Sequence, residues 1–187
     1  MITYAAFLRG VNMTGHNTIR MAELSDMIRK LGFSDAETYI QSGNVIFNYS
    51  GKQDEASLTS VIEAGIKERF GHNVRAMLRS LPELRSLTGK NPYLNEDKFD
   101  SARMAVLMLH EEPDENQILK VKDVDYPPDK FKISGKEIFI FCPNGFGKTK
   151  LYTNFFENKM KVTGTARNWK TMLTILEMCE KKSLEGT

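Results

Sequence analysis

Tyr39-Ile-Gln-Ser-Gly-Asn-Val-Ile-Phe47 is followed, 92 residues later in this 187-residue chain, by Phe131-Lys-Ile-Ser-Gly-Lys-Glu-Ile-Phe139. When the two stretches are superimposed, their central Ser-Gly pairs and their closing Ile and Phe coincide. In the first stretch, Ser-Gly-Asn is expected to form a tight turn between two short strands. Similarity at a fixed spacing is typical of duplicated units. We therefore expect two copies of one strand-containing unit.

The segments around the first copy alternate between strand and helix patterns. Apolar residues recur every three or four positions in the helical segments, and Gly32 and Gly71 follow the two longer helices as stop signals. The first half is expected to contain strands at 3–9, 39–41, 45–49 and 74–79, and helices at 19–31, at 54 or 55 to 70, and at 80–88. This is the split βαβ order of ferredoxin-like domains, followed by a short helix.

The second half repeats this order. Strands are expected at 102–109, 131–133, 137–142 and 163–167, with helices at 113–120 and 149–160 and a C-terminal helix capped by Asn168. The predicted fold class is α+β, with two tandem ferredoxin-like (βαββαβ) domains, antiparallel sheets and an extra C-terminal helix. The domains are expected at 1–88 and 102–187, with a polar linker at 89–101.

Charge is distributed unevenly along the chain. The formal net charge is only +2, and 41% hydrophobic with 27% charged residues is ordinary globular composition. Residues 142–170, however, include six basic residues and one acidic residue, so their formal net charge is +5 and that of the rest of the chain is −3. Such an excess either steers an anionic ligand or forms a solvated basic face.

The chain has two cysteines, Cys142 and Cys179, no signal peptide pattern and no apolar run long enough to span a bilayer. We therefore expect a cytoplasmic protein without membrane attachment. A homodimer is among the states compatible with the sequence.

The stretch Pro143-Asn-Gly-Phe-Gly-Lys-Thr-Lys150 lies between a predicted strand and a predicted helix. Its glycines, its lysines and the start of the helix would direct backbone N–H groups and positive charge at one spot, as an anion site requires. Gly147-Lys148-Thr149 matches the end of the P-loop motif, but Cys142 stands where its first glycine belongs. Two interpretations stay open: a simple anion or nucleic-acid contact, and a plain turn with solvated lysines.

Candidate ligand-binding residues fall into two groups. The predicted anion-binding surface of the second domain consists of Asn144, Gly145, Gly147, Lys148, Thr149, Lys150 and Arg167. A second polar surface is predicted at the Gly/Asn-rich loop of residues 10–18, with Arg9, Asn12 and Asn17. The alternative for Arg9 is a structural ion pair.

Catalytic signals are weak. The three histidines, His16, His72 and His110, are scattered without metal-ligand spacing, so neither a metal nor a cofactor is expected. Cys142, with His110 in the same half, is a candidate nucleophile, but a lone cysteine is more often a small buried hydrophobe. No reaction is predicted, and whether the protein is an enzyme stays open.

RNA binding of the RRM type is a further candidate, because an RRM shares this topology and displays aromatic residues on its third strand. Here Gly145-Phe-Gly147 follows the strand instead of lying on it, and Phe139 and Phe141 suit packing as well as base stacking. A standard RRM is therefore rejected, while a non-standard RNA or nucleotide binder stays open.

Four signatures resemble a known bacterial family, the domain of unknown function 1697. They are Leu8-Arg-Gly-Val-Asn12, Tyr39-Ile-Gln-Ser-Gly-Asn44, Pro143-Asn-Gly-Phe-Gly-Lys-Thr-Lys-Leu151 and Thr165-Ala-Arg-Asn-Trp169. The resemblance implies paired ferredoxin-like domains and supplies no activity. The chain departs from the family in Met13-Thr14, where small residues are usual, and in Lys148, where arginine is frequent; lysine keeps the charge but loses bidentate geometry.

The sequence thus predicts a module that binds a phosphate-bearing small molecule or a nucleic acid such as RNA. The first alternative is a structural or protein-interaction module without a ligand. The second alternative is an enzyme of unidentified reaction.

Overall fold

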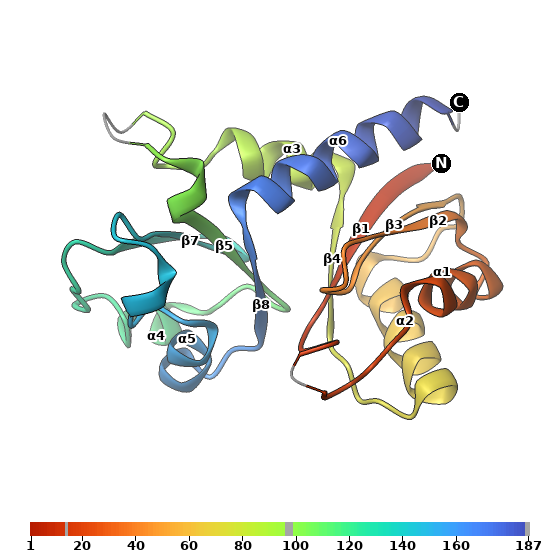
Figure 1. The fold of residues 1–187 in the computed structure, drawn as a ribbon, viewed down its shortest axis with the longest axis horizontal. Helices are drawn as coiled ribbons and strands as arrows, with labels where there is room; N and C mark the ends of the chain where they lie inside the picture. Colours follow the sequence, from red (N-terminus) through yellow and green to blue (C-terminus); the bar gives the residue numbers. More distant parts are fainter. Residues whose placement is uncertain (14, 96–98, 186–187) are drawn as a thin grey trace. The chain divides into compact units, whose positions relative to one another are not determined.

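The computed structural model describes residues 1–13, 15–95 and 99–185. Its contacts divide the chain into two compact units (Figure 1). Unit 1 consists of Met1–Ser86 with Thr174–Thr187, and unit 2 consists of Leu87–Leu173. The expected domains 1–88 and 102–187 stay predictions, as does the linker 89–101, of which residues 96–98 lie outside the described residues.

Unit 1 is built on one four-stranded antiparallel sheet in the order β2-β3-β1-β4. Its elements are β1 (Ile2–Leu8), α1 (Met21–Lys30), β2 (Ser34–Tyr39), β3 (Asn44–Tyr49), α2 (Glu55–Phe70) and β4 (Ala76–Ser80), followed by α3 (Leu81–Gly89). Two antiparallel helices over one sheet of this order are the ferredoxin-like arrangement, which confirms the prediction for the first half.

Unit 2 repeats the topology with the sheet order β6-β7-β5-β8, also antiparallel throughout. Its elements are β5 (Met104–Leu109), α4 (Glu115–Leu119), β6 (Lys130–Ser134), β7 (Glu137–Phe141), α5 (Thr153–Met160) and β8 (Gly164–Asn168), followed by α6 (Trp169–Glu185). Two single turns of 3₁₀ helix, Ser101–Arg103 and Phe146–Lys148, precede β5 and α5. The predicted fold class is therefore confirmed, including the C-terminal helix.

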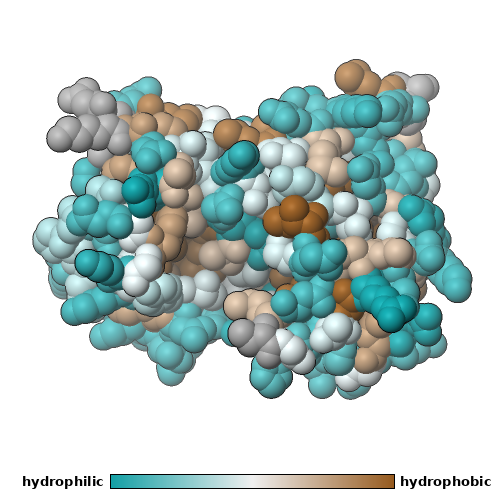
Figure 2. All heavy atoms as spheres, viewed as in Figure 1, coloured by the Kyte–Doolittle hydropathy of each residue, from teal (hydrophilic) through white to brown (hydrophobic). Residues whose placement is uncertain are grey.

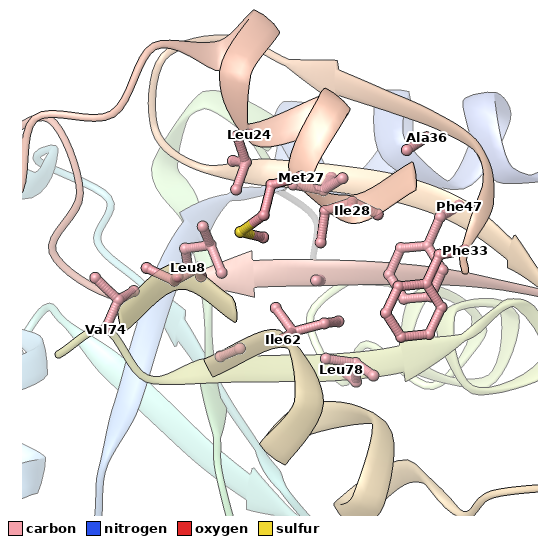
Figure 3. Packing of buried hydrophobic residues seen from close by; sticks show 14 of the residues in the cluster. Leu8, Leu24, Met27, Ile28, Phe33, Ala36, Phe47, Ile62, Val74 and Leu78 are labelled. Atoms are coloured by element: carbon pink, nitrogen blue, oxygen red, sulfur yellow. The ribbon is translucent and has the colours of Figure 1, made fainter. Parts of the chain in front are cut away.

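The core of unit 1 lies between the sheet and its two long helices (Figure 3). Leu24 and Ile28 of α1 and Ile62 of α2 are fully buried, and they face Leu8 and Phe47 of the strands. Burial of each such side chain is worth about 1.5–3 kcal/mol, so this layer accounts for much of the stability of the unit.

Helix α2 ends where the sequence predicts. Asp54 caps its start by accepting a hydrogen bond from Ser57 N at 2.8 Å. Gly71 follows its last residue with φ +74°, the left-handed conformation that glycine adopts without a steric cost.

The nine-residue match between the halves is out of register by one residue. The central strands show this, because Ala6 pairs with Val45, and its counterpart Leu107 pairs with Ile138. The structural offset at β3 and β7 is therefore 93 residues and not 92. A slip of one residue reverses the face of a strand side chain, so Phe47 lies in the helix-covered core whereas Phe139 lies on the opposite sheet face.

The offset arises in the hairpin turns. Tyr39 pairs with Asn44 across a four-residue loop, 40–43, but Ser134 pairs with Glu137 across the two residues 135–136. The shared Ser-Gly letters thus occupy different positions in the two turns. The two halves repeat the same topology, but the nine-residue match does not align equivalent residues.

Helix α5 begins at Thr153 and not at residue 149 as expected. Thr149 is extended, with ψ 154°, and Thr149 Oγ1 accepts a hydrogen bond from Leu151 N at 3.0 Å. This extended passage places Leu151 in the core of unit 2, where it is 2% exposed. Burial of Leu151 therefore delays the helix by four residues.

Candidate functional site

The turn after β7 is held by backbone hydrogen bonds at its base. Cys142 N donates to Arg103 O at 2.8 Å, which ties the turn to the residue that precedes β5. Gly145 N donates to Cys142 O, also at 2.8 Å. The segment 142–145 is therefore tied to the start of β5, and the exposed residues Gly147, Lys148 and Lys150 follow it.

Arg103 is the residue of this site that the sequence patterns did not single out. Gly145 has φ +85°, and an added Cβ there would collide with Arg103 Nη1. The positive φ favours glycine at this position, whereas the guanidinium is the end of a flexible side chain and can move aside. Arg103 is half-exposed, with Nε 3.6 Å from Asp100 Oδ2. It lies about forty positions from the turn in sequence, and only the β5–β7 pairing brings it there.

The two lysines of the turn are exposed. Lys148 ends the 3₁₀ turn, and Lys150 follows in the extended passage. Lys150 Nζ lies 5.1 Å from the centroid of the Tyr126 ring, a cation–π distance. Asn144 and Gly147 are exposed as well, and an added Cβ at Gly147 would meet nothing within 4 Å. A ligand can therefore reach the backbone at Gly147.

Thr149 points inward. It is 4% exposed, and its hydroxyl accepts the hydrogen bond from Leu151 N. Burial raises the pKa of the neighbouring Cys142 thiol; a hydrogen bond with Thr149 lowers it, and the Asp129 carboxylate raises it. The thiol is fully buried and stays protonated near neutral pH, which is the state of a structural cysteine and not of a nucleophile.

Arg167 is not brought together with the lysines. It lies in the row Arg167–Val106–Phe139 of the sheet, whereas its neighbour Ala166 packs against the core that α5 covers. Arg167 therefore occupies the face opposite α5. It is 9% exposed, and Nη1 donates to Thr165 Oγ1 at 2.8 Å and to Ala166 O at 2.9 Å. Burial lowers the pKa of Arg167 to about 10.

In unit 1, the amide nitrogen and the amide oxygen of Asn12 both form hydrogen bonds that hold the loop. Asn12 Nδ2 donates to Ile19 O and Gln41 O, each at 2.9 Å, and Oδ1 accepts from Ile19 N at 2.8 Å. Asn17 Nδ2 donates to Gly10 O at 3.1 Å. Both asparagines have positive φ, 54° and 48°, a conformation that asparagine tolerates better than most residues.

Arg9 is exposed at the end of β1, with its backbone N donating to Arg75 O at 2.9 Å. It shares the loop region with Asn12 and Asn17, so the structure brings these three residues near one end of the sheet. Residue 14 of this loop, part of the Met13-Thr14 departure, lies outside the described residues. Ligand binding by the three residues stays a prediction.

A polar cavity of about 650 Å³ lies in unit 1 between α1, β2 and the end of α6. Its charged groups have partners within the fold: Lys182 Nζ lies 3.5 Å from Glu37 Oε2, and Arg29 Nη1 lies 2.8 Å from Asp26 Oδ1. These charges largely balance, so the cavity has no excess of positive charge.

The described residues contain neither a metal-binding group of side chains nor a membrane-spanning helix. Within 1–13, 15–95 and 99–185, no three His, Cys, Asp or Glu side chains group closely enough to hold a metal ion. None of the helices in these ranges combines the length and the hydropathy of a bilayer span. Most of the face in Figure 2 is hydrophilic, with apolar side chains in separate small groups.

Residues 1–139 match the family model described as protein of unknown function (DUF1697). The chain belongs to the DUF1697 family. The match ends within β7, so the turn 143–150 lies beyond the matched part. The resemblance seen in the sequence motifs is confirmed, and the family description assigns no activity.

This DUF1697 protein is also similar to a solved structure, the conserved bacterial protein SP0830 from Streptococcus pneumoniae. The identity is 25% with a TM-score of 0.71, over 95% of this chain and 98% of that one. No curated protein matches the chain. These relationships support the fold and the family and leave the function to the geometry of the site.

Proposed function

We propose that the protein is a binding module for a phosphate-bearing ligand, which it holds at the turn 143–150 of unit 2. The observation that carries this proposal is the pair of exposed lysines, Lys148 and Lys150, on a turn fixed at its base and adjoined by Arg103.

Charge and rigidity act together at this turn. Arg103 lies against Gly145, while Lys148 and Lys150 project from the residues that follow. Because the hydrogen bonds at Cys142 and Gly145 already hold the corner, binding there orders few backbone torsions. A preorganised site loses less entropy on binding than a flexible one.

The backbone contributes as well. Gly147 is exposed and has open space around it, so a phosphate oxygen can approach the main chain closely. Lysine contacts a phosphate as a point charge and not through a bidentate fork. Recognition at this turn therefore depends on charge, and it should weaken as salt rises.

The proposal does not rely on Arg167 or on the start of α5. Arg167 is buried on the other sheet face, and α5 begins at Thr153, beyond the lysines. The anion surface is accordingly smaller than the sequence predicted: Asn144, Gly147, Lys148 and Lys150, with Arg103 added.

A non-enzymatic role fits the buried, protonated Cys142, the only nucleophilic candidate that the sequence suggested. A purely structural module with solvated lysines is the competing interpretation. The two differ in one measurable respect, because a structural module has no affinity for phosphate that depends on the lysines.

Thermal unfolding in a ligand series tests the proposal. Inorganic phosphate, pyrophosphate and a short single-stranded RNA are added to the wild type, to the double variant Lys148→Ala/Lys150→Ala, and to Lys159→Ala, which removes an exposed lysine of α5 as a matched control. A ligand at 100 times its Kd adds about 2.7 kcal/mol to the free energy of unfolding. We expect a raised Tm in the wild type and in the control, and a smaller or absent rise in the double variant. An equal rise in Tm in all three proteins would show that the lysines of the turn do not bind the ligand.

A further inference from the structure

A second cavity, of about 530 Å³, lies in unit 2, and its lining residue Tyr126 contacts Lys150 of the lysine turn. Tyr126 lines this cavity, and the Tyr126 ring is the one that Lys150 Nζ approaches to 5.1 Å. The volume falls in the range of about 300–1,000 Å³ that small-molecule sites occupy. The cavity and the turn therefore meet at Tyr126.

The lining of the cavity is mainly apolar and partly aromatic. Val121, Val124 and Phe131 contribute aliphatic and aromatic surface beside Tyr126. The same side chains pack against the core of unit 2, and Tyr126 meets Phe155 edge-on at 5.8 Å. These walls are thus held in place by the core, as a preformed site requires.

Two acids accompany the basic groups at this cavity. Asp125 and Asp129 line it, together with Lys122, Lys130 and Lys132. Acids repel a bare phosphate, so an inorganic anion does not explain the whole lining. A ligand that carries hydroxyl or amino donors besides its phosphate would use the carboxylates as hydrogen-bond acceptors.

We infer that the ligand is of the mononucleotide class, with its flat body in this cavity against Tyr126 and its phosphate at Lys148 and Lys150. The inference rests on the function proposed above and specifies its ligand. An aromatic base stacks on a tyrosine ring, and such stacking contributes to affinity whatever the base. Sugar hydroxyls or base amino groups would donate hydrogen bonds to the carboxylates of Asp125 and Asp129.

Calorimetric titration of the full chain separates the parts of this ligand. The probes are adenosine monophosphate, adenosine and pyrophosphate. We expect adenosine monophosphate to bind at least about tenfold more tightly than either of the other two, because only it occupies both the cavity and the turn. Each 1.4 kcal/mol corresponds to a factor of ten in affinity.

Two variants assign the binding energy. Tyr126→Leu keeps apolar volume but removes the ring, and it should weaken adenosine monophosphate about tenfold while leaving pyrophosphate unchanged; Tyr126→Phe should bind like the wild type. Because Tyr126 also packs on the core, Asp125→Asn serves as a second variant at an exposed position. It should weaken adenosine and adenosine monophosphate but not pyrophosphate.

The outcomes distinguish this inference from the function on which it rests. Pyrophosphate binding that depends on the lysines, with no gain for adenosine monophosphate, would overturn the inference and keep the proposed function. If adenosine monophosphate binds the Lys148→Ala/Lys150→Ala variant as tightly as the wild type, both the inference and the proposed function would be overturned. A short RNA that binds while adenosine monophosphate does not would also overturn the mononucleotide assignment.

Discussion

Gly43 shows how one missing Cβ joins two sequence motifs of unit 1. Its φ is +73°, and an added Cβ would lie 2.9 Å from Leu8 Cβ and closer still to a methyl group of Val11. Leu8 N also donates to Gly43 O at 2.8 Å, and Asn12 reaches Gln41 O. The motifs that begin at Leu8 and Tyr39 therefore pack against each other at one end of the sheet.

We predict that Gly43→Ala destabilises the protein by about 3 kcal/mol, since left-handed strain of about 1 kcal/mol adds to overpacking of about 2 kcal/mol. Gly71→Ala is the matched control, because its φ of +74° is the same but its Cβ would meet nothing within 4 Å. Urea denaturation should show a loss of only about 1 kcal/mol for the control. Equal losses would mean that the contact with Leu8 and Val11 is unimportant.

The thiol of Cys179 links stability to alkaline pH. Burial raises the pKa of Cys179 from 9.0 to about 12, with the Lys182 charge opposing this shift. Between these two values the unfolded chain releases a proton that the native protein keeps. The stabilisation that the neutral thiol provides is therefore complete below pH 9 and is lost as pH rises toward about 12.

We predict that the free energy of unfolding falls more steeply above pH 9 in the wild type than in Cys179→Ala. The alanine variant loses some packing at every pH, so only the difference in slope is informative. Denaturant titrations from pH 8 to pH 10.5 measure it. Parallel curves for the two proteins would contradict a buried, neutral thiol.

At the scale of single residues, sequence patterns identified the exposed Lys148 and Lys150 but misjudged Thr149 and Arg167. Exposure of the lysines follows from their charge. Burial of Thr149 follows from the packing of Leu151, and burial of Arg167 from the face that its strand presents, so both require the folded chain. Arg103 lacked a local signal altogether.

Helix α6 starts directly at the end of β8, and a side chain closes that junction. Asn168, the last residue of β8, accepts a hydrogen bond through Oδ1 from Thr171 N at 2.8 Å. In unit 1, Ser80 ends β4, and the hydrogen bonds run the other way: Ser80 N and Oγ donate to Glu83 Oε2 in the first turn of α3, at 2.7 and 2.6 Å. Each unit thus passes from its last strand into a capped helix without a loop.

We expect Asn168→Ala to lower the free energy of unfolding by about 1 kcal/mol, the usual value of an N-cap. Asn168→Ser retains a capping oxygen and should lose far less. Thermal and urea unfolding of the two variants provide the comparison. If the serine variant is as unstable as the alanine variant, the hydrogen bond to Thr171 is not what Asn168 contributes.

Elements were predictable where capping and periodicity agree, and less so where packing decides. Asp54 and Gly71 mark both ends of α2 in the sequence, and the helix lies between them. The start of α5 was missed because Thr149 and Lys150 suit a helix locally, whereas Leu151 must reach the core through extended backbone. The register of β7 was missed because two hairpin turns of different length contain the same Ser-Gly letters.

On the scale of the whole molecule, the repeat is βαββαβα, with α3 and α6 as its closing helices. The order was predictable from the sequence because most elements have their own periodicity and stop signals, although β2 lies at Ser34–Tyr39 and not at residues 39–41 as expected. The sequence did not indicate that most of α6 belongs to unit 1, because α6 directly follows the last strand of unit 2. Its residues from Thr174 onward belong to unit 1, where Lys182 pairs with Glu37 and Glu180 pairs with Arg85 at 3.0 Å.

Removal of residues 174–187 should therefore destabilise unit 1 more than unit 2. The truncated protein loses the buried Ile175 and Cys179 as well as both ion pairs. Amide hydrogen exchange should accelerate in β1 and β3 more than in β5 and β7. Truncation after Ser183, which removes the 79% exposed Leu184, is the control and should change little. Faster exchange mainly in unit 2 would instead support a second domain that extends to residue 187.

Phosphate binding at the turn 143–150 can be detected residue by residue through the shifts of backbone amide resonances. Pyrophosphate is titrated into the ¹⁵N-labelled full chain, and the backbone amide resonances are followed. We expect saturable shifts, largest at Asn144, Gly147, Lys148 and Lys150, that are lost in Lys148→Ala/Lys150→Ala. An absence of saturable shifts, or shifts centred on Asn12 and Asn17 of unit 1, would contradict phosphate binding at this turn.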